Sequence, residues 1–106
     1  MATPPPRDHR ITIDEGAAHT RRFREVNPGT KTPKAGMFWR SGGLDELMAQ
    51  KGCAGLRVYF GRDTAGAGHL VLVAVDAQGD DLSTGTVLEQ ELPCPPFCST
   101  TGPLAG

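Results

Sequence analysis

The sequence lacks long apolar runs and an excess of charge of either sign. Its 106 residues contain no run of about 18 apolar residues, which a transmembrane helix would need. Lys and Arg number 11 and Asp and Glu 12, so the formal net charge is -1. A general nucleic-acid binder normally carries a basic excess. We therefore expect neither a membrane nor a nucleic acid as a partner.

The N-terminus also lacks the apolar stretch of a secretory signal. Residues 1–10 are polar and contain Pro4-Pro5-Pro6, so we predict a disordered, proline-rich leader. Without a signal the expected localisation is cytoplasmic. In that compartment the three cysteines are expected to be reduced thiols or metal ligands before they are structural disulfides.

Two helices are expected. Thr12 followed three residues later by Glu15 is a capping box, so Thr12 is predicted as the N-cap of a helix that ends near Val26. A shorter helix is expected over residues 44–50. Its start could be capped by Ser41, and Gly52 suits its C-terminal left-handed position. Met37-Phe38-Trp39 precedes it as a short strand or a helix lead-in.

Three strands complete the predicted fold. Residues 56–60 alternate, residues 69–75 are nearly all apolar and suit a central strand, and residues 84–92 form a third candidate. On this third strand Glu89 and Glu91 share one face. The elements predict a small α+β fold, with a meander-like antiparallel three-stranded sheet and two helices packed on one face. We expect one domain over residues 11–98 and a flexible tail over 99–106.

The helical and strand patterns also predict a core. The apolar positions expected to be buried are Ile13, Phe23, Leu47, Leu56, Val58, Leu70, Leu72 and Val73.

The cysteines are the main candidate metal ligands. Cys94 and Cys98 form a C-x3-C pair that two intervening prolines make rigid. Together with Cys53 and one histidine they could hold zinc, or ligate an iron–sulfur cluster incompletely. The fourth ligand would be His19, on the first helix, or His69, at a strand start. Redox thiols, a Cys94–Cys98 disulfide and inert buried cysteines are the alternatives. The meander favours a local Cys94/Cys98 pair with Cys53 well away from both.

Several motifs resemble known proteins. The segments GCAGLRVY (52–59), LVLV (70–73) and PCPPFC (93–98) resemble a group of small uncharacterised bacterial proteins with a GCxGxRxY strand and a C-terminal PCPPxC motif. The first segment and the two C-terminal cysteines also resemble A-type iron–sulfur carrier proteins, with CPPFC in place of that family's C-G-C. This second resemblance implies an iron–sulfur role for Cys53, Cys94 and Cys98.

No set of acid, base and nucleophile, and no cofactor-binding loop, can be read from the sequence. The glycine-rich segment 61–68 lacks the Lys-Ser/Thr ending of a phosphate loop. We therefore expect a non-enzymatic interaction or assembly module without a cofactor. It would form a homo-oligomer or bind a protein partner, because the strand over 69–75 needs a cover on both faces. The alternative is a metal- or iron–sulfur-binding protein that uses the cysteine thiolates.

Overall fold

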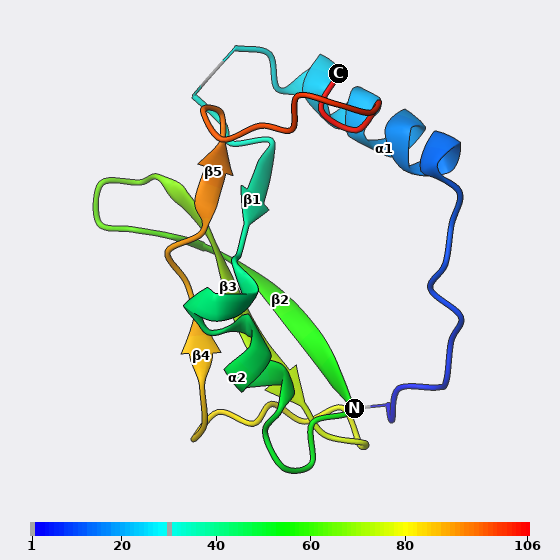
Figure 1. Ribbon diagram of the computed structural model, residues 1–106, viewed down its shortest axis with the longest axis vertical. Coiled ribbons are helices and arrows are strands. Elements are labelled where there is room, and N and C mark those ends of the chain that lie inside the picture. The colour runs from blue at the N-terminus through cyan, green and yellow to red at the C-terminus, as the bar shows by residue number, and fades with distance from the viewer. Residues whose placement is uncertain (1, 30) are drawn as a thin grey trace. The chain divides into compact units, whose positions relative to one another are not determined.

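The computed structural model describes residues 2–29 and 31–106, which divide into two compact units (Figure 1). The first unit holds the chain start up to Pro6 together with Phe38–Glu91, and the second holds Arg7–Met37 and Leu92–Gly106. The predicted single domain over residues 11–98 therefore corresponds to parts of both units. None of the helices in the described residues has the length and apolar character needed to cross a membrane.

The first unit is built on an antiparallel sheet in the order β2-β3-β4. Its strands are β2 (Gly55–Arg62), β3 (Gly68–Val75) and β4 (Val87–Leu88). The predicted three-stranded antiparallel sheet, with the apolar strand in its centre, is thus confirmed. The β2–β3 hairpin closes through a tight turn in which Gly66 takes a φ of 87°, a conformation that favours glycine.

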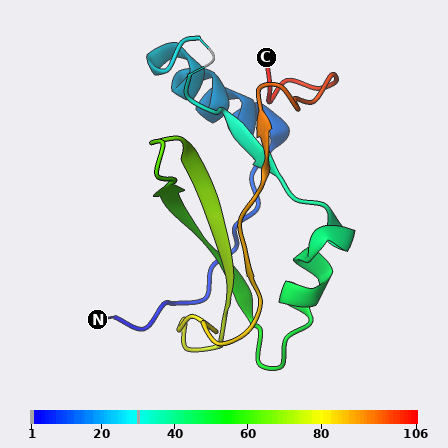
Figure 2. The ribbon, with the colours of Figure 1, turned by 90° about the vertical axis from the view of Figure 1, so that its left-hand side faces the viewer.

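A short helix covers part of this sheet. Helix α2 (Leu44–Met48) follows a 3-10 turn, η1 (Arg40–Gly42), and packs against β3 and β4. Figure 2 shows α2 on one side of the β2–β3 hairpin. Its N-cap is Gly43, with no side-chain capping bond, so the expected cap at Ser41 is wrong. Gly52 has a φ of 85°, as expected after this helix.

The core of the first unit lies between α2 and β3. Leu47 and Ala74 are fully buried and Leu72 is 5% exposed, with partly buried apolar side chains around them. The predicted burial of Leu47, Leu72 and Val73 is confirmed, and Leu70 is half-buried.

Burial on β2 was predicted wrongly. Leu56 and Val58 are 42% and 43% exposed, although they share a sheet face with Leu72 and Ala74. The physical reason is the shortness of α2, which packs over β3 and β4. Strand β2 is one position further out, at the edge of the sheet.

The second unit contains α1 (Ile13–Val26) and a two-stranded antiparallel sheet of β1 (Ala35–Met37) and β5 (Leu92–Cys94). The capping box is confirmed, because Thr12 accepts the Glu15 N–H and the Glu15 side chain accepts the Thr12 N–H. The apolar face of α1 was predicted wrongly. Ile13 and Phe23 are 56% and 43% exposed, and the C-terminal segment contacts this helix near Gly16 and Arg24.

The predicted third strand over 84–92 is divided in the structure. Its first half contributes β4 to the first unit and its last residue, Leu92, begins β5 in the second. Gln90 lies between them with a φ of 60°, which extended strands do not adopt. The backbone turn at this residue ends the pairing with β3.

Candidate functional site

Two of the three cysteines are joined. Cys94 and Cys98 form a disulfide with a Cα–Cα distance of 4.7 Å, so the predicted local pairing of these two is confirmed. Disulfide sulfurs are not thiolates and do not bind a metal ion as thiolates do. The proposal that this pair holds zinc or a cluster therefore applies to the reduced chain and stays a prediction.

The candidates Cys53 and His19 belong to different units. Cys53 is a half-buried free thiol in the first unit, with its Sγ 3.5 Å from the Gly55 carbonyl oxygen. His19 lies on α1 in the second unit, and its Nδ1 is 2.9 Å from Arg22 Nη2. Each of these two side chains therefore interacts with a residue close to it in the sequence.

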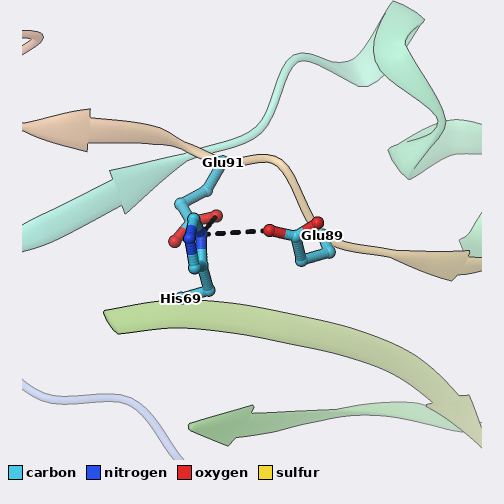
Figure 3. A group of neighbouring side chains, drawn as sticks. All are labelled: His69, Glu89 and Glu91. Carbon is cyan, nitrogen blue, oxygen red and sulfur yellow. Dashed lines mark hydrogen bonds and ion pairs between the residues drawn. The ribbon is translucent and has the colours of Figure 1, made fainter. Parts of the chain in front are cut away.

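His69, at the start of β3, is surrounded by carboxylates. Its Nδ1 lies 3.0 Å from Glu89 Oε1 and 3.3 Å from Glu91 Oε2. Its Nε2 lies 2.9 Å from Asp63 Oδ2. Figure 3 shows the imidazole rising from β3 toward both glutamates, which come from the segment that follows β4. Three acidic groups therefore converge on one ring.

The sheet register explains this convergence. Leu72 pairs with Leu88 across β3 and β4, so the chain that follows β4 runs back along β3 toward His69. Side chains two residues apart share a face, so Glu89 is directed to the same side. The left-handed Gln90 between the two glutamates bends the backbone, and both carboxylates reach the same nitrogen.

The members of this cluster differ in how firmly they are held. The Glu91 side chain is 5% exposed, and its Oε1 accepts the Leu70 N–H at 3.0 Å. Asp63 accepts the N–H groups of Ala65 and Ala67 through Oδ1. The Glu89 side chain is 41% exposed and receives no hydrogen bond from the described residues beyond its ion pair with His69.

The cluster shifts the ionisation of its own groups. Asp63, followed by Glu91, holds the pKa of the His69 imidazole above its ordinary value, because each carboxylate stabilises the imidazolium. In return, the hydrogen bond from His69 is the main cause that lowers the pKa of Asp63.

A second polar group lies on the same sheet face. Asp81 binds Arg57 Nη1 through Oδ1 at 2.5 Å and accepts the Tyr59 hydroxyl hydrogen bond through Oδ2. Arg57 pairs with Val73 on one side of β3, and Asp81 pairs with Val75 on its other side. The ion pair therefore crosses the central strand. It covers part of the second apolar face for which the sequence required a cover.

The outer edge of β2 presents unpaired backbone groups. Asp63 donates its N–H to the Ala67 carbonyl at 3.0 Å, which closes the hairpin in the register of the β2–β3 ladder. Because successive residues of a strand direct their N–H and C=O groups to opposite sides, Leu56, Val58 and Phe60 point theirs away from β3. Within the described part of the chain, β3 is the only strand that pairs with β2.

Comparisons with protein-family models, curated proteins and solved structures found no match to this chain. Two features of the first unit are candidate functional sites: the edge of β2 and the cluster around His69.

The sequence contained a partial signal for each feature. His69 was a candidate ligand, and Glu89 and Glu91 were placed on one strand face, but they were not connected to His69. The missing information was the register between β3 and β4. The sequence did not predict the exposed edge of β2. Alternation in residues 56–60 indicates that the strand has one apolar face, but it does not show how much of that face a short helix covers.

Proposed function

We propose that this chain is a small assembly module, and that its first unit associates with a second copy of the chain along β2. The observation that supports this most is the exposure of apolar side chains on an edge strand. Phe60 is 88% exposed, and Leu56 and Val58 on the same face are both more than 40% exposed. These are also the residues whose backbone groups point outward from the sheet.

The edge carries few of the features that keep edge strands apart. Natural edge strands are commonly protected by prolines, bulges, lysines or short length. The β2 sequence GLRVYFGR contains no proline and no lysine, and it pairs with β3 over eight residues without a bulge. Its two charged residues are Arg57, which is engaged by Asp81, and Arg62 at the strand end. An open and regular edge of this kind is suited to strand addition.

A two-fold axis at Val58 gives a self-complementary pairing. In an antiparallel arrangement about this axis, Val58 lies opposite Val58 of the second copy, and Leu56 lies opposite Phe60. The three apolar side chains of each copy then share one face of a continuous sheet. On the other face Arg57 lies opposite Tyr59 of the second copy, a pair in which the guanidinium can contact an aromatic ring. A two-fold interface of this kind closes after two copies.

Light scattering coupled to size-exclusion chromatography tests the proposal. The wild-type chain is expected to elute as a dimer at micromolar concentration. Val58→Lys would place two like charges opposite each other at the axis and is expected to give a monomer. Val26→Lys is the matched control, because Val26 is 76% exposed on α1, which belongs to the second unit. A monomeric wild type, or a Val58→Lys variant that remains dimeric, would refute the assembly role.

The proposed compartment is the cytoplasm. There the Cys94–Cys98 pair would rest as a dithiol, and the disulfide would be its oxidised form. Thiol alkylation in lysates of cells that make the chain tests this assignment. Rapid labelling of both cysteines supports the cytoplasm, and complete protection of both contradicts it.

A further inference from the structure

We propose that His69, Glu89 and Glu91 bind one divalent ion of the first transition series, with Asp63 as the outer partner of the imidazole. The site would use neither the cysteines nor the outward edge of β2. Its ligands would be His69 Nδ1 and one oxygen from each glutamate. These three atoms lie within 4.8 Å of one another.

The spacing of the ligand atoms fits an ion of this size. Zinc bonds of about 2.0–2.1 Å to nitrogen and oxygen place neighbouring ligand atoms about 2.8–3.4 Å apart in octahedral or tetrahedral geometry. The Nδ1 of His69 lies 3.0 Å from the Glu89 oxygen and 3.3 Å from the Glu91 oxygen. The two glutamate oxygens lie within 4.8 Å of each other, so an ion bound to all three atoms would draw these oxygens together.

The charge of the cluster favours a cation. Among the described residues, no Lys or Arg forms an ion pair with Asp63, Glu89 or Glu91, and the imidazole supplies at most one positive charge. The single N–H on Nδ1 can make a well-aligned hydrogen bond to only one of the two carboxylates, and that hydrogen bond is made with Glu91. Glu89, at 3.0 Å from the same nitrogen, is left with an ion pair alone. A divalent ion in place of this proton would contact both carboxylates at once.

The second nitrogen of the ring is already arranged for this role. Metal-binding histidines almost always donate their other ring N–H to a carboxylate, a carbonyl or water, which fixes the ring and its tautomer. Asp63 Oδ2 occupies that position, 2.9 Å from His69 Nε2. Asp63 is itself held by the Ala65 and Ala67 N–H groups. The outer carboxylate is thus positioned by the β2–β3 turn independently of the glutamates.

The bend at Gln90 helps to bring the two glutamates together. A φ of 60° is uncommon for a residue other than glycine and costs free energy. Here it lies between the two glutamates that converge on His69. Glu91 is anchored by the Leu70 N–H with its side chain 5% exposed, whereas Glu89 remains accessible from solvent. An ion could therefore enter from the side of Glu89.

The donor set also indicates which ions bind. Imidazole nitrogen suits zinc, iron, nickel and copper, whereas calcium and magnesium prefer oxygen ligands throughout. We therefore expect binding of Zn²⁺ and much weaker binding of Ca²⁺.

Calorimetric titration of the full-length, disulfide-bonded chain with zinc chloride tests the site. The wild type is expected to bind one Zn²⁺ per chain. Asp63→Asn should weaken binding about 10- to 100-fold, as is typical for an outer-shell carboxylate. Glu89→Gln, at a largely exposed position, should weaken it further without affecting the fold. Glu46→Gln and His19→Gln remove a carboxylate and an imidazole elsewhere, and both should bind as the wild type does.

Cys53→Ser separates this site from a thiolate site. Unchanged zinc affinity in Cys53→Ser, with loss of affinity in Glu89→Gln, supports the proposal. Three results would overturn it: no zinc binding by the folded wild type, wild-type affinity in Glu89→Gln and His69→Gln, or loss of binding in Cys53→Ser. Because the readout is ions bound per chain, it is independent of whether the chain dimerises.

Discussion

Val58 lies directly opposite Leu72 across the β2–β3 ladder, yet Val58 is 43% exposed and Leu72 only 5%. The two side chains share a sheet face, so strand alternation alone would bury both. The difference arises because α2 packs over β3 and β4. This relationship separates the residues that stabilise the first unit from those available to a partner.

Leu72→Ala should lower the free energy of unfolding by about 2–5 kcal/mol, because it leaves a cavity between β3 and α2. Chemical denaturation followed by circular dichroism measures this loss. Val26→Ala, at a position that is 76% exposed, should change stability by less than about 0.5 kcal/mol. Equal effects of the two variants would show that the core is placed wrongly.

Thr12→Ala should cost about 1 kcal/mol of stability, since it removes the side-chain half of the capping box of α1. The Thr20 hydroxyl donates only to the Ala17 carbonyl within the same helix. Thr20→Ala is therefore the matched control and should not destabilise α1, because alanine has the higher helix propensity. Helical circular dichroism during thermal unfolding compares the two variants. A loss in Thr20→Ala as large as in Thr12→Ala would argue against the capping box.

Much of the fold was predictable because its signals are local. The capping box at Thr12, the central position of residues 69–75 and the Gly52 helix end follow from neighbouring residues. The extent of burial was not predictable in the same way. Leu56 and Ile13 have apolar periodicity, but their exposure depends on the length and position of elements distant in the sequence. The division of residues 84–92 at Gln90 likewise had no local signal, because glutamine does not indicate a left-handed backbone.

Asp81→Asn should make the free energy of unfolding less dependent on pH in the acidic range. Tyr59, and then Arg57, hold the pKa of Asp81 below its ordinary value of about 3.9. A lowered native pKa contributes stability that is fully present above the unfolded value and is lost as pH falls through the native one. The wild type should thus be more stable than the variant at pH 7, and the difference should shrink below about pH 4. Denaturation across pH measures this, and a difference that grows in acid would contradict the assignment.

Replacing both Cys94 and Cys98 with Ser should lower stability by about 2 kcal/mol or less, because in the chain-entropy model a disulfide across so short a loop restricts the unfolded chain only modestly. Urea denaturation of the oxidised wild type and the double variant measures the loss. A thiol reductant should lower the wild type to the level of the variant and leave the variant unchanged. A loss far above this value would show that the pair does more than restrict the unfolded chain.

The residue types of the candidate metal site could be predicted from the sequence, but their arrangement could not. His69 was recognisable as a ligand, and the glutamates as neighbours on one face. Their convergence depends on the pairing of Leu72 with Leu88 and on the bend at Gln90. Both are properties of the folded backbone, so the donor set emerges only once the strands are paired.

Hydrogen exchange at single β2 amides tests the assembly role most directly. The amides of Arg57, Tyr59 and Gly61 face β3 and should be protected at any concentration. Those of Leu56, Val58 and Phe60 face outward, and among the described residues no strand pairs with that edge of β2. Nuclear magnetic resonance should find these three protected at high concentration and exchanging rapidly on dilution or in Val58→Lys. If they exchange rapidly in the concentrated wild type as well, β2 does not pair with a second copy and the proposed function is wrong.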